Sequence, residues 1–128
     1  MIGAALATAA LLLAPPTATI DVLWTTIAAR GAAVDVAFGV SCPAGFTGTV
    51  TVSVAQARDD GLQAHGTAVT DLACVGSALL YTQRVTATVT GAPFERGKAT
   101  LAMQVVACDE TECFSTPLNG TTRITKLP

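Results

Sequence analysis

Apolar and polar residues alternate along most of the chain after Thr19. A period of two residues is typical of β-strands with one buried face, whereas a helix places apolar residues three and four positions apart. The pattern predicts about seven strands. They comprise residues 20–24, 34–42, 50–54, 63–75, 81–89 and 99–107 and a short segment centred on Ile124. Threonine is common between the valines, as expected for the solvent-facing side of an antiparallel sheet.

Turn-forming residues separate these segments. Pro43-Ala44-Gly45, Arg58–Gly61 and Gly91–Pro93 each fall between two alternating runs, and such residues favour the backbone conformations of tight turns. Short strands at this spacing predict an all-β fold, and specifically an immunoglobulin-like antiparallel β-sandwich with two disulfides. A small barrel is the main alternative.

Residues 1–18 have the character of a signal peptide. Residues 2–14 are uncharged and apolar, and the run is shorter than a bilayer span. Small and helix-breaking residues follow, so we expect cleavage after Ala18, a single domain over residues 19–128, and a secreted protein of the extracellular space or cell envelope. The segment lacks an early basic residue, since the first cation is Arg30. The alternative is that the segment is a buried N-terminal strand or helix.

The four cysteines predict two disulfides. If successive strands alternate in direction, Cys42, Cys74 and Cys108 end strands of the same direction, and Cys113 lies across the next loop. All four then lie at one end of the domain. Proximity in sequence favours Cys108–Cys113 together with Cys42–Cys74. The alternatives are an inter-sheet Cys42–Cys108 bridge, which pairs Cys74 with Cys113, and a zinc site of reduced thiols. We expect no metal.

The charges exclude some classes of partner. The net charge is −2, and a nucleic-acid or anionic-membrane binder needs clustered cations. The cations stand apart along the sequence, so we predict neither partner, and no second apolar stretch is long enough to span a membrane. They are Arg30, Arg58, Arg84, Arg96, Lys98, Arg123 and Lys126.

No catalytic set is evident in the sequence. His65 is the one histidine, and it is expected in a loop or at a strand edge. Nucleophilic catalysis needs a base beside the nucleophile and a group that orients the base. The Asp59-Asp60 pair and the acidic loop near Cys108 are typical of solvated turns. We therefore predict a protein that is not an enzyme and that needs no cofactor.

The candidate binding loop lies between the last two cysteines. It consists of Asp109, Glu110, Glu112 and the adjacent Phe114, whose ring is expected to be exposed at the cysteine-rich end. Loops at the ends of a sandwich commonly carry function. Trp24, on the first strand, is expected in the core.

Several motifs together resemble a set of small secreted actinobacterial proteins. The order is Cys42, the threonine–valine strand 48–56, Cys74-Val75-Gly76, the segment Phe94–Ala99 and the pair Cys108 and Cys113. The resemblance implies export and an immunoglobulin-like sandwich. It implies nothing about activity, because no function is established for that set.

The loop from Cys108 to Cys113 also resembles a loop of the neocarzinostatin-type apoproteins, which are secreted immunoglobulin-like sandwiches with two disulfides. In that family a disulfide closes a loop of the same length near the C-terminus, and this loop borders a cleft for an enediyne chromophore. The other disulfide of the family is short, whereas Cys42 and Cys74 stand far apart. This resemblance implies a small-molecule carrier.

The sequence therefore leaves two function hypotheses. The first is a non-enzymatic secreted module that binds an unknown protein or a cell-envelope partner. The alternative is a carrier of a small hydrophobic, chromophore-like ligand, with its pocket at the cysteine-rich end of the sandwich.

Overall fold

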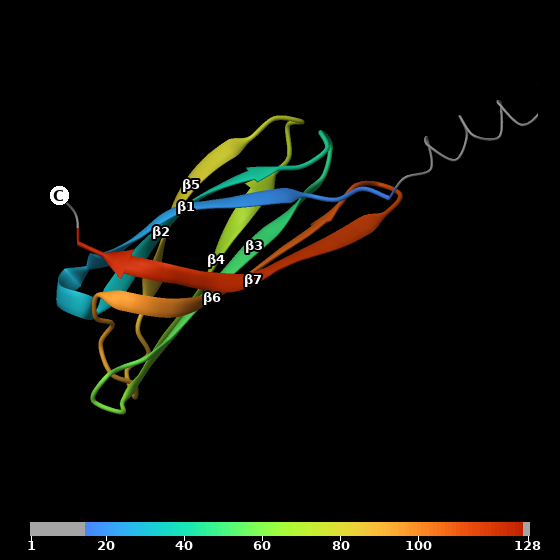
Figure 1. Cartoon of the computed structure of the whole chain (residues 1–128). Helices are drawn as coiled ribbons and strands as arrows, with labels where there is room; N and C mark the ends of the chain where they lie inside the picture. Colours follow the sequence, from blue (N-terminus) through green and yellow to red (C-terminus); the bar gives the residue numbers. More distant parts are fainter. Residues whose placement is uncertain (1–14, 127–128) are drawn as a thin grey trace, which may run out of the picture.

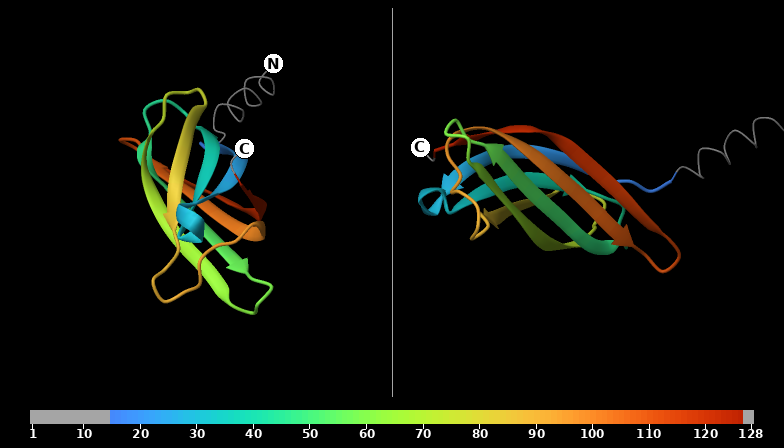
Figure 2. Two further views of the ribbon diagram at one scale, coloured as in Figure 1. Left: turned by 90° about the vertical axis from the view of Figure 1, so that its left-hand side faces the viewer. Right: turned by 90° about the horizontal axis from the view of Figure 1, so that it is seen from below.

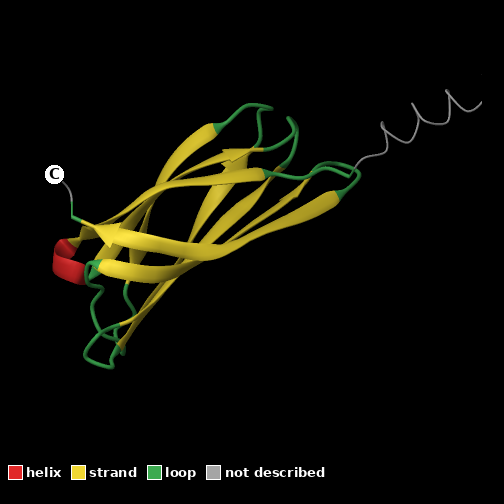
Figure 3. Ribbon diagram, viewed as in Figure 1, coloured by secondary structure: helices red, strands yellow, loops and turns green. Residues whose placement is uncertain are grey.

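The computed structural model describes residues 15–126, which form seven strands and one short 3-10 turn (Figure 1). The all-β prediction is confirmed, and Figure 3 shows how little of the chain is helical. In chain order the elements are β1 (Thr19–Ala28), η1 (Ala29–Gly31), β2 (Ala33–Ser41), β3 (Thr47–Ala57), β4 (Gln63–Ala73), β5 (Leu79–Thr86), β6 (Gly97–Cys108) and β7 (Cys113–Thr125).

The strands form one sheet in the order β4-β3-β6-β7-β1-β2-β5. Every neighbouring pair is antiparallel except β1 and β7, which run parallel through Thr25–Thr26 and Ile124–Thr125. The prediction of a purely antiparallel sheet was therefore wrong, and the sheet is mixed. The parallel contact arises because the first and last strands run in the same direction and meet side by side.

The sheet curls until its two edge strands nearly meet (Figure 2). Edge strands β4 and β5 approach each other without a ladder of their own among the described residues. Backbone hydrogen bonds join the chain after β5 to β4, from Thr88 N to the His65 oxygen (2.9 Å) and from Ala92 N to the Gln63 oxygen (3.0 Å). A side-chain hydrogen bond also joins Thr70 to Gln83. The result is a nearly closed, barrel-like body.

The core is lined by the inward positions of the alternating strands. Phe38 on β2 stacks on Tyr81 of β5 with 5.5 Å between ring centroids. Smaller side chains fill most of the remaining interior, and burial of such chains supplies the main stabilisation of a fold of this kind. The fully buried valines are Val34, Val36, Val40, Val50, Val52, Val54, Val85 and Val105.

A β-bulge in β1 changes which side chains face the core. The register with β2 shifts between Val22 and Trp24, so Leu23 is an extra residue without a partner. Trp24 then lies opposite Ala37 and is 56% exposed. The prediction that Trp24 belongs to the core was therefore wrong, because simple alternation does not anticipate a bulge. Thr25 becomes the buried residue.

Two other strand boundaries differ from the prediction. β7 extends from Cys113 to Thr125 and pairs along the whole of β6, whereas the pattern predicted a short strand around Ile124. Pro117 and Gly120 obscure the apolar alternation in this segment, and pairing with β6 keeps it extended. β5 ends at Thr86, before the predicted end at residue 89.

The predicted leader lies mostly outside the described residues. Ala18 is buried, and its backbone N–H donates to the Thr116 hydroxyl at 3.2 Å. The Thr17 hydroxyl is hydrogen-bonded to the same Thr116 hydroxyl at 3.1 Å. Residues 17 and 18 thus lie against β7, and cleavage after Ala18 stays a prediction.

Gly66 allows β4 and β5 to approach closely. A Cβ atom at this position would lie 2.2 Å from the backbone oxygen of Thr86, far inside van der Waals contact. Because the obstacle is backbone, it cannot move aside by changing a side-chain rotamer. The absence of a side chain at Gly66 is therefore a requirement for closing the seam.

We expect Gly66→Ala to destabilise the protein by about 1–3 kcal/mol, since the added methyl must push the two edge strands apart. The matched control is Gly120→Ala on β7, where a Cβ would meet no atom within 4 Å. Urea denaturation followed by circular dichroism measures both changes in the free energy of unfolding. Equal effects of the two substitutions would contradict the close approach at the seam.

Candidate functional site

The two disulfides are Cys42–Cys74 and Cys108–Cys113, as the sequence favoured. They lie at one end of the barrel, here called the cysteine end, because Thr47 at the start of β3 pairs with both Ala73 and Cys108. Cys42 and Cys74 are buried, and Gly76 N donates to the Cys42 oxygen at 3.1 Å. The predicted pairing and the predicted common location are both confirmed.

The acidic loop at this end is a tight turn organised by Asp109. Its carboxylate Oδ1 accepts hydrogen bonds from the backbone N–H groups of Thr111 and Glu112, both at 2.8 Å, and from the Thr111 hydroxyl at 3.1 Å. The backbone hydrogen bonds from Thr111 and Glu112 lower the pKa of Asp109. Glu110 and Glu112 are exposed. Asp109 thus has a structural role, and the other two carboxylates face solvent.

Phe114 is buried, which corrects the expectation that its ring is exposed. It lies opposite Ala107, an inward position of β6, so its side chain also faces the interior. The ring packs edge-on against Phe46 with 5.1 Å between centroids. These two rings lie inside the barrel at the end where the carrier hypothesis places its pocket, and that hypothesis stays a prediction.

The other groups considered for catalysis lie apart. His65 is an exposed residue of edge strand β4, opposite Ala55. Asp60 accepts two hydrogen bonds from Arg58, at 2.8 and 3.2 Å, and the hydrogen bond with Arg58 lowers the pKa of Asp60. Within residues 15–126, no three His, Cys, Asp or Glu side chains are arranged to hold a metal ion. Asp60 thus belongs to a hydrogen-bonded turn and His65 to an edge strand.

A basic cluster lies at the end of the barrel opposite the cysteines. Pairing of β6 with β7 sets Lys98 opposite Arg123, and Arg96 and Lys126 line a common hollow with Arg123. We call these four residues the basic end. Four of the seven cations that stand apart in the sequence are thus neighbours in space. This pairing was predictable from the sequence. If Cys108 and Cys113 face each other across a hairpin, an equal number of residues back along each strand places Lys98 opposite Arg123.

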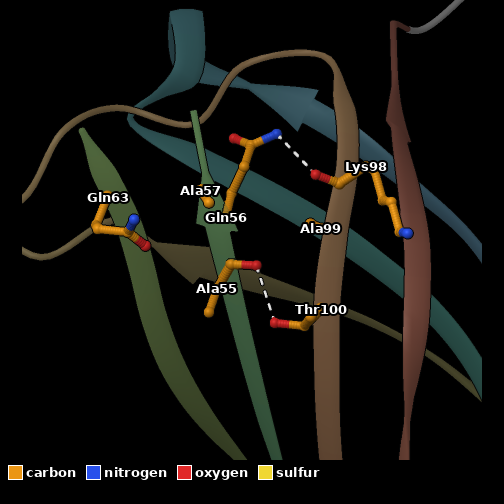
Figure 4. Close-up of a pocket in the computed structure, with 7 residues that line it drawn as sticks. All are labelled: Ala55, Gln56, Ala57, Gln63, Lys98, Ala99 and Thr100. Carbon is orange, nitrogen blue, oxygen red and sulfur yellow. Dashed lines mark hydrogen bonds between the residues drawn. The ribbon is translucent and has the colours of Figure 1, made fainter. Parts of the chain in front are cut away.

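A hollow of about 340 Å³ opens beside Lys98, between the diverging ends of β3 and β6 (Figure 4). The β3–β6 ladder stops at Ala55 and Thr100. Beyond this pair the strands separate, and Ala57, Gln63 and Lys98 line the space between them. The hollow is lined by alanine methyl groups, by the side chains of Gln56 and Gln63, and by Thr100 and Lys98.

Gln56 closes the inner side of this hollow. Its side chain is buried, and Nε2 donates to the Glu95 oxygen at 2.8 Å and to the Lys98 oxygen at 3.4 Å. Its Oε1 accepts from Glu95 N at 2.9 Å. The amide thus forms the hydrogen bonds that backbone groups of Glu95 and Lys98 would have formed with β3 if the β3–β6 pairing had continued. Buried polar groups need such partners.

The largest exposed apolar side chains of β1 and β5 flank the same part of β2. Leu23 is 47% exposed, Trp24 56% and Leu80 75%. Trp24 lies opposite Ala37 and Leu80 opposite Gly39, two small residues on the outward face of β2. We call Leu23, Trp24 and Leu80 the apolar patch. Sequence reasoning missed it because the bulge reverses the direction of Trp24.

An ion pair lies next to the apolar patch. The Arg84 guanidinium donates to both carboxylate oxygens of Asp35 at 2.9 and 3.0 Å. This hydrogen bonding with Arg84 lowers the pKa of Asp35. Asp35 precedes Ala37 by two positions on the same face of β2, so the patch has a charged, hydrogen-bonded rim.

Comparison with known proteins finds no matching family model, no matching curated protein and no matching solved structure. Among residues 15–126, no helix is long and apolar enough to cross a bilayer.

Removal of the disulfides should destabilise the fold unequally. On the chain-entropy view, the long Cys42–Cys74 loop contributes about 3–4 kcal/mol and the short Cys108–Cys113 loop about 2 kcal/mol. We expect the double substitution of Cys42 and Cys74 by alanine to cost more than that of Cys108 and Cys113. Guanidinium denaturation of both variants measures the difference, and the reverse order would contradict this account.

The Asp109 turn should contribute to acid sensitivity. Because the folded state lowers the pKa of Asp109, its contribution to stability is present above its unfolded pKa, near pH 4, and is lost as pH falls below that value. Asp109→Asn removes this titration. We expect the free energy of unfolding of the variant to fall less steeply than that of wild type below about pH 4. Identical acid slopes would show that the carboxylate is not stabilised in the turn.

Proposed function

We propose that the protein is a non-enzymatic, exported binding module that holds a protein partner on the outer face of β1, β2 and β5. The observation that carries this proposal is the exposure of Trp24 within the apolar patch. Exposed tryptophans are uncommon on surfaces with no partner, and tryptophan is enriched among the residues that dominate binding energy at protein interfaces.

The shape of the face suits an interface. Trp24 on β1 and Leu80 on β5 stand on either side of β2, where Ala37 and Gly39 leave a low floor. The Leu80 side chain reaches over Gly39, since Leu80 Cδ2 lies 3.5 Å from where a Cβ of Gly39 would be. An apolar centre with the Asp35–Arg84 pair at its edge matches the core-and-rim arrangement of protein interfaces.

We also propose an immunoglobulin-like sandwich fold and a location outside the cytoplasm. The strand order supports an immunoglobulin-like sandwich, with β5-β2-β1 as one layer, β4-β3-β6-β7 as the other, and the short β1–β7 contact joining them. The two disulfides support an oxidising compartment outside the cytoplasm. The resemblance to small secreted actinobacterial proteins is consistent with both.

The single tryptophan makes the proposal directly measurable. Trp24 is the only tryptophan of the chain, so its fluorescence reports on the apolar patch alone. Partners are captured with the purified full-length protein, identified, produced in isolation and titrated back. We expect binding to shift the Trp24 emission to shorter wavelength, because burial removes water from the indole. We also expect Trp24→Ala to weaken binding by at least about tenfold.

The matched control is Leu62→Ala, which removes an exposed leucine from the turn between β3 and β4. It should leave binding and emission unchanged. Both substituted side chains are solvent-exposed, so the fold should be preserved. A partner retained equally by Trp24→Ala, or self-association that this substitution abolishes, would overturn the proposal of a protein partner on this face.

A further inference from the structure

The basic end is a cluster of cations without carboxylate partners among the described residues. The ion pairs of residues 15–126 are Arg58–Asp60, Arg58–Glu95 and Arg84–Asp35. None of them involves the four cations of the basic end. These side chains therefore keep their charge and hydrogen-bond donors available to an anion from solution.

A hollow of about 440 Å³ lies among these cations. Arg96, Arg123 and Lys126 line it, together with Gly97 and the strand segment Ile124–Thr125. Ile124 is buried and provides the base of the hollow. The space around Gly97 is open, since a Cβ there would meet no atom within 4 Å. The cations thus surround a space that can admit a small anionic group.

The carboxylates nearest this end are Asp59, Asp60 and Glu95, and Arg58 forms ion pairs with Asp60 and Glu95. The acidic loop of the β6–β7 hairpin is far away. Asp109, Glu110 and Glu112 lie at the tip of the β6–β7 hairpin, eleven residue steps along the ladder from the Gly97–Ile124 pair. At about 3.3 Å per residue, this separation is roughly 35 Å. It exceeds the screening length of about 8 Å in physiological salt several-fold. At the basic end and the adjoining β3–β4 turn, the five cations Arg58, Arg96, Lys98, Arg123 and Lys126 outnumber the three carboxylates Asp59, Asp60 and Glu95, although the net charge is −2.

The make-up of the cluster favours one phosphate group over a long polyanion. Two arginines supply planar guanidinium groups that match phosphate oxygens in a bidentate manner. The cations occupy the ends of only two strands, β6 and β7. A nucleic acid needs a basic stripe that follows its backbone, and the outer face of β6 and β7 next to this end carries no further cation.

The surface beside the basic end is uncharged and rich in hydroxyl and amide groups. Lys98 lies at the edge of the hollow of Figure 4 with its ammonium group directed toward β7, and Gln63 and Thr100 offer polar groups beside alanine methyls. Thr121 and Asn119 follow on the adjacent outward positions of β7. A ligand with its phosphate at the basic end would therefore lay an uncharged, hydroxylated portion on this surface.

We propose that the basic end and the adjoining hollow bind the phosphate ester of a sugar or polyol. The arginines and lysines hold the phosphate, and the neutral surface of β3, β6 and β7 contacts the hydroxylated portion. This chemistry occurs in free sugar phosphates, in polyol-phosphate polymers and in glycerophospholipid headgroups. The site is on a different part of the surface from the apolar patch, so the two proposals are tested separately.

The experiment is a calorimetric titration of the full-length protein at low salt with glucose 6-phosphate, glycerol 3-phosphate, glucose and inorganic phosphate. We expect saturable binding of both phosphate esters, about tenfold weaker binding of inorganic phosphate, and none of glucose. Arg96→Gln with Arg123→Gln should weaken ester binding at least about tenfold. The backbone amide resonances of Gly97 and Thr125 should shift during the same titration followed by NMR.

The control variant is Thr47→Glu with Val75→Glu, which lowers the net charge by the same two units at exposed positions of the cysteine end. It should bind the esters within about twofold of wild type, given the distance and the screening. Equal losses in the two variants would reduce the effect to overall charge and overturn the site. Absence of saturable ester binding at millimolar concentration, or tighter binding of inorganic phosphate than of the esters, would also overturn it.

Two further arms identify the source of the ester. Binding to poly(glycerol phosphate), but not to phosphatidylglycerol vesicles, assigns a soluble or wall-linked polymer. Binding to the vesicles, lost in the arginine double variant, assigns a lipid headgroup, and either result supports the proposal. Tighter binding of a DNA oligonucleotide than of any ester, lost in the same variant, would replace the proposed ligand by a nucleic acid.

Discussion

Strand β1 has to pair with β2 along its whole length and with β7 over its last residues. The bulge at Leu23 makes both pairings possible, because an extra residue increases the local twist and turns the end of the strand toward β7. The Thr25 hydroxyl then meets the Thr122 hydroxyl at 2.8 Å in the interior, and the Thr125 hydroxyl donates to the Thr25 oxygen at 3.3 Å. These contacts hold the first and last strands together and complete the wall of the barrel.

The same bulge determines which side chains are exposed on the surface near β1. It turns Trp24 outward beside Ala37, and it brings the end of β7, with Arg123 and Lys126, alongside the end of β1. The two ends of the barrel differ as a result. The cysteine end is filled by Phe46 and Phe114 and held by both disulfides. At the other end the strands separate, Gln56 pairs the backbone groups left between them, and hollows remain open.

Much of the fold follows from the alternation of valines, because the pleat places every second residue on one face wherever a strand is regular. The strand segments were predictable on that basis, and the disulfide pairs were predictable from strand direction and proximity in sequence. Trp24, the parallel β1–β7 contact and the length of β7 were not, because each depends on a bulge or on pairing between distant segments. Phe114 is buried, against expectation, because the hairpin register places it opposite Ala107 at an inward position. The pairing of Lys98 with Arg123 at the basic end was predictable from the hairpin register that the Cys108–Cys113 disulfide implies.

The long β6–β7 hairpin has cations at its open end and carboxylates at its tip, so its charges are separated along its length. A protein of this kind does not respond to a charged surface according to its net charge alone. A surface that carries phosphate groups attracts the β6 start and the β7 end of such a hairpin and repels its tip. The outer face of β1, β2 and β5 is a different part of the molecule from this end and is left uncovered in that orientation. Under the two proposals above, one domain is held through its basic end while a protein partner occupies the outer face of β1, β2 and β5.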